Sequence, residues 1–149
     1  MVNVTKLDEC ADVSEYREKV AELESVLKDH DPIELEVRHH FAHGTYTREL
    51  FIPKGTMLTG QIHRHSCINI ISKGKIIAFT DKGRIEIEAP HTFVSGSGVK
   101  KAGYALEDTI WLNVHPWDGP EDVELIEKEI VVSSYEQLEI ENKEALWLG

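Results

Sequence analysis

The sequence has little cysteine and no long apolar run. Its two cysteines, Cys10 and Cys67, can form no disulfide framework and match no metal-binding spacing, which favours a reducing compartment. No apolar stretch reaches the roughly 20 residues that a transmembrane helix needs, and no apolar signal-peptide core is visible near the start. We therefore expect a cytoplasmic protein with no membrane partner.

Positive charge is also scarce. The 149 residues carry 16 Lys and Arg against 27 Asp and Glu, a net charge of −11. This charge is uneven, with −5 over residues 1–32, +2 over residues 33–117 and −8 over residues 118–149. Because a phosphate backbone needs a basic protein face, nucleic acid is excluded as a general partner. The length favours a single domain with a sizeable core.

The two ends of the chain have the apolar spacing of helices. Within residues 1–32, one stripe at helical spacing predicts an N-terminal helix that ends before Pro32 and packs on the main domain or on a second copy: Tyr16, Val20, Leu23 and Leu27. Residues 118–149 predict a C-terminal helical appendage, with a helix start at 119–122, an edge strand at 130–132 and a helix from 133 to about 146.

The middle segment, residues 33–117, has the period of two that is typical of strands. Short alternating runs end at Gly or Pro turns; one expected strand covers 57–65, and a last strong strand covers 109–115. No helical stretch between them is long enough for a parallel crossover, so an all-β sandwich or barrel is predicted.

Two histidines lie two residues apart in the stretch 60–69. On a strand, His63 and His65 leave the same face with their Cα atoms roughly 6–7 Å apart. Two imidazoles at that spacing can bind one divalent ion, or can hold one substrate proton as an acid–base pair. A chain with 8 histidines also produces such a pair by chance, so two ordinary half-buried histidines are the third interpretation.

The residues around this pair resemble the cupin superfamily. From Gly55 through the His-x-His pair to Gly74, the chain follows the first cupin motif, except that Asn69 stands where cupins have a glutamate. The segment 96–101 is the best match to the second motif, with Lys101 in place of its histidine. The resemblance implies a mostly β fold, a cupin-type jelly-roll β-barrel over residues 33–117, with an N-terminal helix and a C-terminal helical appendage.

Cupins normally bind their metal through three histidines and a glutamate, and this resemblance implies a site in the barrel mouth. Asn69 is a poor ligand, so we expect His115 to complete the set; with Trp111 and Asn113 it shares one face of the last strand. The predicted metal ligands are His63, His65 and His115, for zinc, iron, manganese or nickel. A site without any metal, with a solvated His115, is the alternative.

A small anionic ligand is expected beside the metal. Its predicted contacts are Asn69, Lys101, Arg48, Tyr46 and Asn113. The remaining histidines are expected in exposed loops or turns: the stretch HHFAHG at 39–44 as a polar loop, with a surface metal clamp as the alternative, and His91 in a turn after Pro90.

Residues 89–104 and 106–111 are also similar to small single-domain cupin-like proteins that occur widely in tailed bacteriophages, whose role is generally unassigned. This similarity implies a phage accessory protein in the host cytoplasm. The apolar end 146–148 and the N-terminal stripe predict a homo-oligomer.

Three functions stay open, and with them whether the protein is an enzyme. The first is a cupin that binds a metal, a small anion or both. The second is a metal-free isomerase or epimerase that uses His63 and His65 as its acid–base pair. The third is a non-catalytic structural or host-interaction protein.

Overall fold

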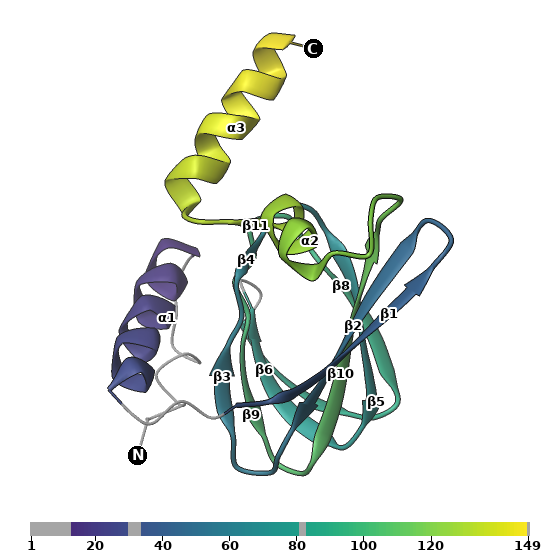
Figure 1. Cartoon of the computed structure of the whole chain (residues 1–149). Coiled ribbons are helices and arrows are strands. Elements are labelled where there is room, and N and C mark those ends of the chain that lie inside the picture. Colours follow the sequence, from purple (N-terminus) through teal and green to yellow (C-terminus); the bar gives the residue numbers. More distant parts are fainter. Residues whose placement is uncertain (1–12, 30–33, 81–82, 149) are drawn as a thin grey trace.

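The computed structural model describes residues 13–29, 34–80 and 83–148 (Figure 1). The elements follow one another as α1 (Val13–Lys28), β1 (Glu36–Ala42), β2 (Thr45–Ile52), β3 (Met57–Thr59), β4 (Ile62–His63), β5 (Cys67–Lys73), β6 (Lys75–Thr80), β7 (Gly83–Glu88), β8 (His91–Ser95), β9 (Ala102–Ala105), β10 (Thr109–Pro116), α2 (Val123–Ile130), β11 (Val131–Val132) and α3 (Tyr135–Leu148). Cys10, Pro32 and Ile33 lie outside the described residues, as do the side chains of Tyr16, Leu27 and residues 145–148.

Two antiparallel sheets form the barrel (Figure 1). One has the strand order β1-β2-β10-β5-β8, and the other has the order β3-β9-β6-β7. In β10 the buried residues Thr109, Trp111, Asn113 and His115 alternate with less buried neighbours, which is the period of two seen in the sequence. The mostly β jelly-roll barrel, with a helix before it and helices after it, is confirmed.

An apolar core fills the space between the sheets. Its buried members come from strands of both sheets: Leu50, Ile52, Ile71, Ile76, Ala78, Ile87, Ala105 and Trp111. Leu35 and Val37 pack against it from the segment where the alternating pattern begins. Burial of one such large side chain is worth about 1.5–3 kcal/mol, so this cluster supplies much of the driving force for folding.

One tight turn in the barrel requires glycine. Gly74, between β5 and β6, has φ of +88°, and a Cβ placed there would lie 2.2 Å from the carbonyl oxygen of Asp108. No side chain fits in that space, and L-residues rarely adopt this φ. Gly74 is also the last glycine of the first cupin-like motif, so the tight turn explains why that position of the motif is a glycine.

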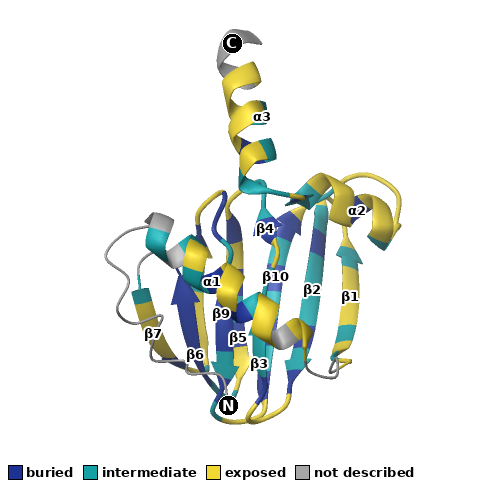
Figure 2. Cartoon of the chain, turned by 90° about the vertical axis from the view of Figure 1, so that its left-hand side faces the viewer, coloured by how far each residue is buried: buried dark blue, intermediate teal, exposed yellow. Residues whose placement is uncertain are grey.

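Helix α1 packs on the barrel of its own chain (Figure 2). Val20 is 1% exposed and Leu23 is 7% exposed, and both contact a cluster with Ile77, Phe79 and Ala102 on β6 and β9. An ion pair between Lys100 and Glu24 adds a polar link. The sequence left open whether this helix packs on the main domain or on a second copy of the chain, and in the structure it packs on the main domain.

The C-terminal segment is built into the mouth of the barrel rather than attached beside it. Strand β11 pairs with β4, which places Val131 opposite His63 and Val132 opposite Ile62. Helix α2 runs across that end of the barrel (Figure 1). It begins at Val123 after the N-cap Asp122, whose side chain accepts from two backbone N–H groups, so the start expected near Pro120 lies two to three residues too early.

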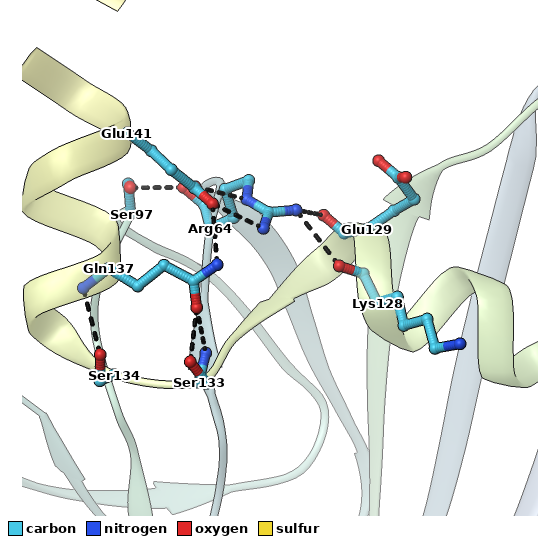
Figure 3. A network of polar contacts seen from close by, with 8 residues as sticks. All are labelled: Arg64, Ser97, Lys128, Glu129, Ser133, Ser134, Gln137 and Glu141. Atoms are coloured by element: carbon cyan, nitrogen blue, oxygen red, sulfur yellow. Dashed lines mark hydrogen bonds and ion pairs between the residues drawn. The ribbon is translucent and has the colours of Figure 1, made fainter. Parts of the chain in front are cut away.

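Arg64 connects the barrel to both C-terminal helices (Figure 3). Its Nη1 donates to the carbonyl oxygen of Glu129 at 2.5 Å, at the end of α2 where helical carbonyls lack partners. Its Nε and Nη2 donate to the two carboxylate oxygens of Glu141 on α3, at 2.8 and 3.1 Å. Ser97 in turn donates to the carbonyl oxygen of Arg64 at 2.6 Å. Arg64, the residue that follows His63, therefore anchors the C-terminal segment that covers the barrel mouth.

Other local expectations differ from the structure, among them the turn expected at His91, which is the first residue of β8. The expected strand 57–65 is broken at Gly60, whose N–H donates to the carbonyl of Lys101, so that β3 and β4 are separate. The stretch expected as a loop from residue 39 belongs largely to β1. Strand β9 has a small-residue sequence that was not predicted as a strand. Within the described ranges no helix has the length and apolarity needed to cross a membrane.

Candidate metal and ligand site

A cavity of about 410 Å³ opens between the two sheets at the end covered by α2. One wall comes from β1, β2 and β10, and the opposite wall comes from β3 and β9 with the residues next to them. Ile126 and Glu127 of α2, with Ile130 and Val131 after them, form part of the lining. The volume lies within the roughly 300–1,000 Å³ range of small-molecule sites.

Three side chains of the types that can bind a metal ion meet beside this cavity. One donor atom from each of His63, Cys67 and His115 lies within 4.8 Å of the other two. The Sγ atom of Cys67 is 3.6 Å from Nδ1 of His63, and the rings of His63 and His115 meet edge to face at a centroid distance of 5.4 Å. Strands β4, β5 and β10 each contribute one member of this His–Cys–His group.

The donor set fits a divalent ion of borderline softness. Zinc binds imidazole nitrogen at about 2.0–2.1 Å and thiolate sulfur at about 2.3 Å, so its tetrahedral ligands lie roughly 3.3–3.6 Å apart. The distance of 3.6 Å between Cys67 Sγ and His63 Nδ1 falls at the end of that range. The remaining pairs, within 4.8 Å, need a contraction of about an ångström, which side-chain rotation can supply.

Asn69 does not act as the missing glutamate ligand, because its amide is fully engaged. It is 0% exposed, and its Oδ1 accepts from Trp111 Nε1 at 3.1 Å and from Asn113 Nδ2 at 2.7 Å. Since an indole N–H can only donate, these bonds fix the orientation of the Asn69 amide. Its Nδ2 must then face the opposite side, where it donates to Ser95 Oγ at 3.0 Å.

The same orientation determines what surrounds the Cys67 sulfur. Ser95 Oγ accepts from Asn69 Nδ2 and from Lys101 Nζ at 3.1 Å, which uses both of its lone pairs. Its own hydrogen is left for Cys67 Sγ at 3.5 Å. The amide nitrogens of Asn69 and Asn113 lie 3.8 Å from the same sulfur. The two hydrogens of Asn69 Nδ2 go to Ser95 Oγ and to the Cys67 carbonyl oxygen at 3.2 Å, so Ser95 and Asn113 are the donors left for Sγ. These two donors give the sulfur an acceptor role.

Burial and nearby positive charge keep both histidines of the group neutral. Burial is the largest cause of the low pKa of His63, about 3, and the charges of Lys101, His115 and Arg48 lower it further. The pKa of His115 falls to about 4, from burial first and then from Lys101 and Arg48. Burial also lowers the pKa of the Lys101 ammonium. Neutral imidazole is the form that binds metals.

Tyr46 and Arg48, on the inner face of β2, both line the cavity. Tyr46 stacks on His115 at a ring distance of 6.2 Å, and its hydroxyl lies 2.6 Å from Nδ1 of His39 on β1. Burial raises the pKa of Tyr46, so its hydroxyl stays protonated. In the described part of the chain, the Arg48 side chain makes neither a hydrogen bond nor an ion pair.

The structure brings together most of the predicted site residues but leaves His65 and Asn69 apart. Those that line the cavity are His63, His115, Lys101, Arg48, Tyr46 and Asn113. His65 is exposed and lies outside the His–Cys–His group, because β4 ends at His63 and the period of two stops there. Asn69 lies behind the cavity wall in the hydrogen-bond network.

Cys67 was missed because its spacing to the histidines matches no short metal motif. A signal was nevertheless present. Cys67, Asn69 and Ile71 alternate along β5 and are all buried, so the strand period that placed Asn69 in the barrel also placed Cys67 there. The contact with His63 then depends on the bend at residues 64–66, which the sequence pattern did not predict.

Comparison with known proteins supports the fold. No family model and no curated protein matches the chain. Among solved structures, KdgF from Halomonas sp. matches 64% of this chain and 93% of its own, with 17% identity and a TM-score of 0.50. An RmlC-like cupin from Shewanella frigidimarina matches 62% of this chain and 86% of its own, with 18% identity and a TM-score of 0.50. At these identities the likeness concerns the fold alone.

Proposed function

We propose that this chain, which has the cupin fold, binds a divalent metal ion through His63, Cys67 and His115, beside a cavity that takes a small anionic ligand. The observation that carries the proposal is the convergence of two neutral imidazoles and a thiol, from three strands, within 4.8 Å. When bound, the ion would supply Lewis-acid polarisation of a ligand oxygen. His65, expected as a ligand, is replaced by Cys67 in this proposal.

The chain's own residues have separate tasks around such a site. Arg48 and Lys101 give the cavity its positive charge, and Asn69 fixes the donors that face the Cys67 sulfur. Helix α2 and β11 cover the mouth and limit the access of water. Burial of these groups strengthens every electrostatic interaction inside the cavity.

Acid–base chemistry without a metal is the less supported alternative. His65 is exposed and absent from the cavity lining, and the histidines among the described lining residues are His63 and His115. With pKa values of about 3 and about 4, both are weak bases at neutral pH, whereas an efficient general base has a pKa near the working pH. At neutral pH the rings are unprotonated, so no proton competes with a metal ion for their nitrogens.

Metal analysis of the untagged protein tests the proposal. After incubation with Zn²⁺ or Co²⁺ and removal of free ions, we expect about one ion per chain, and a sulfur-to-cobalt charge-transfer band in the cobalt form. Cys67→Ser should abolish that band, and His63→Ala with His115→Ala should abolish binding.

The control variant is His65→Ala, which should retain full metal content because His65 lies outside the group. Folding of every variant is checked by circular dichroism. A wild-type chain that holds no ion after this treatment refutes the proposal, and loss of the ion in His65→Ala alone would return the site to the pair expected from the sequence. The phage context and the homo-oligomer stay predictions.

A further inference from the structure

An arginine without a protein partner lies in the wall of the cavity. Arg48 is half-buried on β2, in register with Asn113 of β10, and makes no side-chain hydrogen bond or ion pair among the described residues. Three other arginines each have a partner: Arg17 lies over the Tyr135 ring, Arg38 pairs with Glu36, and Arg64 pairs with Glu141. In a chain of net charge −11, a guanidinium that faces a cavity rather than an acid indicates an external anion.

The charge inside the cavity is not balanced by the protein. Arg48 and Lys101 both line it, and the fields of both reach His63 and His115. Glu127 is the one carboxylate among the described lining residues; it is exposed on α2 and forms an ion pair with neither cation. A bound anion would offset the repulsion among these groups, so the cavity is electrostatically prepared for one.

The rest of the lining is apolar and requires a different kind of contact. Leu35, Val37, Leu50, Leu58 and Trp111 present carbon surface to the cavity, and all five belong to or pack against the barrel core. A ligand that fills about 410 Å³ therefore has an apolar body as well as a charged group. A bare inorganic ion would leave this surface in contact with water and gain nothing from it.

We propose that the cavity binds a small organic monocarboxylate, with its carboxylate on Arg48 and its apolar body against Trp111 and the neighbouring aliphatic side chains. A single guanidinium fork matches the two oxygens of a carboxylate. A phosphate dianion has more charge to desolvate than a monocarboxylate, and the aliphatic side chains that line part of the cavity gain nothing from it. The inference rests on the proposed function only in placing the ligand in the same cavity, because Arg48 acts without the metal.

Binding of simple probes tests this inference on the full chain. Acetate, hexanoate, octanoate and benzoate are titrated by calorimetry, with hexanamide as the neutral counterpart and inorganic phosphate as the competing anion. Quenching of Trp111 fluorescence is the second readout, and Trp111→Phe identifies its share of the signal. We expect hexanoate or benzoate to bind more tightly than acetate, hexanamide and phosphate.

Variants at two arginines distinguish a specific contact between Arg48 and the carboxylate from a nonspecific effect of removing one positive charge. Arg48→Gln should weaken carboxylate binding about tenfold or more, the usual cost of a lost charge-assisted pair, and leave the weak hexanamide binding unchanged. Arg38→Gln is the matched control, because Arg38 lies on the neighbouring strand β1, is exposed and is absent from the lining. Equal affinity of both variants for hexanoate would overturn the assignment of Arg48.

The remaining outcomes also decide between ligands. Tighter binding of phosphate than of any carboxylate overturns the proposal in favour of a phosphorylated ligand, and no binding of any probe refutes it. Metal content is measured in parallel, on the same samples and after chelator treatment. Carboxylate binding that persists without metal supports this inference even if the proposed metal site is wrong. Metal bound at one ion per chain without carboxylate binding supports the metal site and refutes this inference.

Discussion

The buried amide of Asn69 is the feature whose energetic role can be tested most directly. Its Oδ1 accepts from Trp111 Nε1 and Asn113 Nδ2, and all three residues are at most 9% exposed. The variant Asn69→Leu has a similar volume but leaves both donors without a partner. Its own stability change is hard to interpret, because a buried leucine adds apolar contacts. A double-mutant cycle with Trp111→Phe removes that difficulty.

The cycle isolates the hydrogen bond between the indole and the amide. Trp111→Phe removes the Nε1 donor and also some packing, and the packing loss is common to both backgrounds. In the wild-type background, Trp111→Phe lowers the free energy of unfolding by the lost packing and the lost hydrogen bond together. In the Asn69→Leu background the donor is already unpaired, so its removal gives back a desolvation penalty of about 1–3 kcal/mol. We expect a coupling free energy of about 1–3 kcal/mol.

Urea unfolding followed by far-ultraviolet circular dichroism measures the four free energies, because tryptophan fluorescence changes with Trp111 itself. Asn142→Leu is the control: Asn142 is exposed on α3, and its cycle with Trp111→Phe should be additive. Additivity within about 0.5 kcal/mol for the Asn69 cycle would refute the network, since distant and independent sites add to that extent.

Three further predictions concern pH, the C-terminal helices and the turn at Gly74. In chelator-treated protein, the rings of His63 and His115, with pKa values of about 3 and about 4, are neutral in the folded chain at pH 5, whereas the unfolded chain protonates them below about 6.5. The contribution of the two neutral rings to the free energy of unfolding is therefore full above about pH 6.5 and falls by about 2 kcal/mol per histidine by pH 5. In urea titrations at several pH values, the free energy of unfolding of His115→Gln should depend less steeply on pH than that of the wild type. An equal slope for both proteins would contradict this. The hydrogen bond from Arg64 lowers the pKa of Glu141, so the contribution of this pair to holding α3 is full above the ordinary carboxyl range and is lost as the pH falls through the lowered pKa. Arg64→Gln should remove the same contribution at neutral pH, seen as faster proteolysis within residues 133–148, and unchanged proteolysis would exclude this role. Gly74→Ala forces a Cβ against the carbonyl of Asp108. Thermal unfolding should therefore show a loss of stability several times the roughly 1 kcal/mol that an alanine in the left-handed conformation ordinarily costs. A loss of only about 1 kcal/mol would show that the turn can relax.

The fold was predictable from the sequence where one physical pattern acted alone. Strand β10 follows from the alternation between Thr109 and His115, and β6 follows from an apolar run bounded by turns. Helix α1 follows from the stripe that includes Val20 and Leu23, whose burial is confirmed. In each case side-chain spacing along one element was sufficient, because the partner surface only had to be apolar.

The candidate site was predictable only in part, because its geometry depends on contacts between elements. His115 and Tyr46 could be placed by strand period alone, and both line the cavity. The separation of His65 from His63 depends on the bend after β4, which forms where Arg64 binds the C-terminal helices. The approach of Cys67 to His63 follows from the same bend, and no pattern within residues 60–69 predicts it.

The polar groups around this site are not what stability alone would select. Asn69, Ser95, Lys101 and Asn113 are all at most 9% exposed, and within the described residues no buried side-chain nitrogen or oxygen lacks a partner. Well-packed apolar side chains of similar volume are often equally stable or more stable than buried polar networks. A barrel that only served as a scaffold would gain by such replacements. The network instead directs two donors, Ser95 and Asn113, at the Cys67 sulfur and leaves Arg48 to face the cavity, which is the arrangement that the proposed metal and anion site requires.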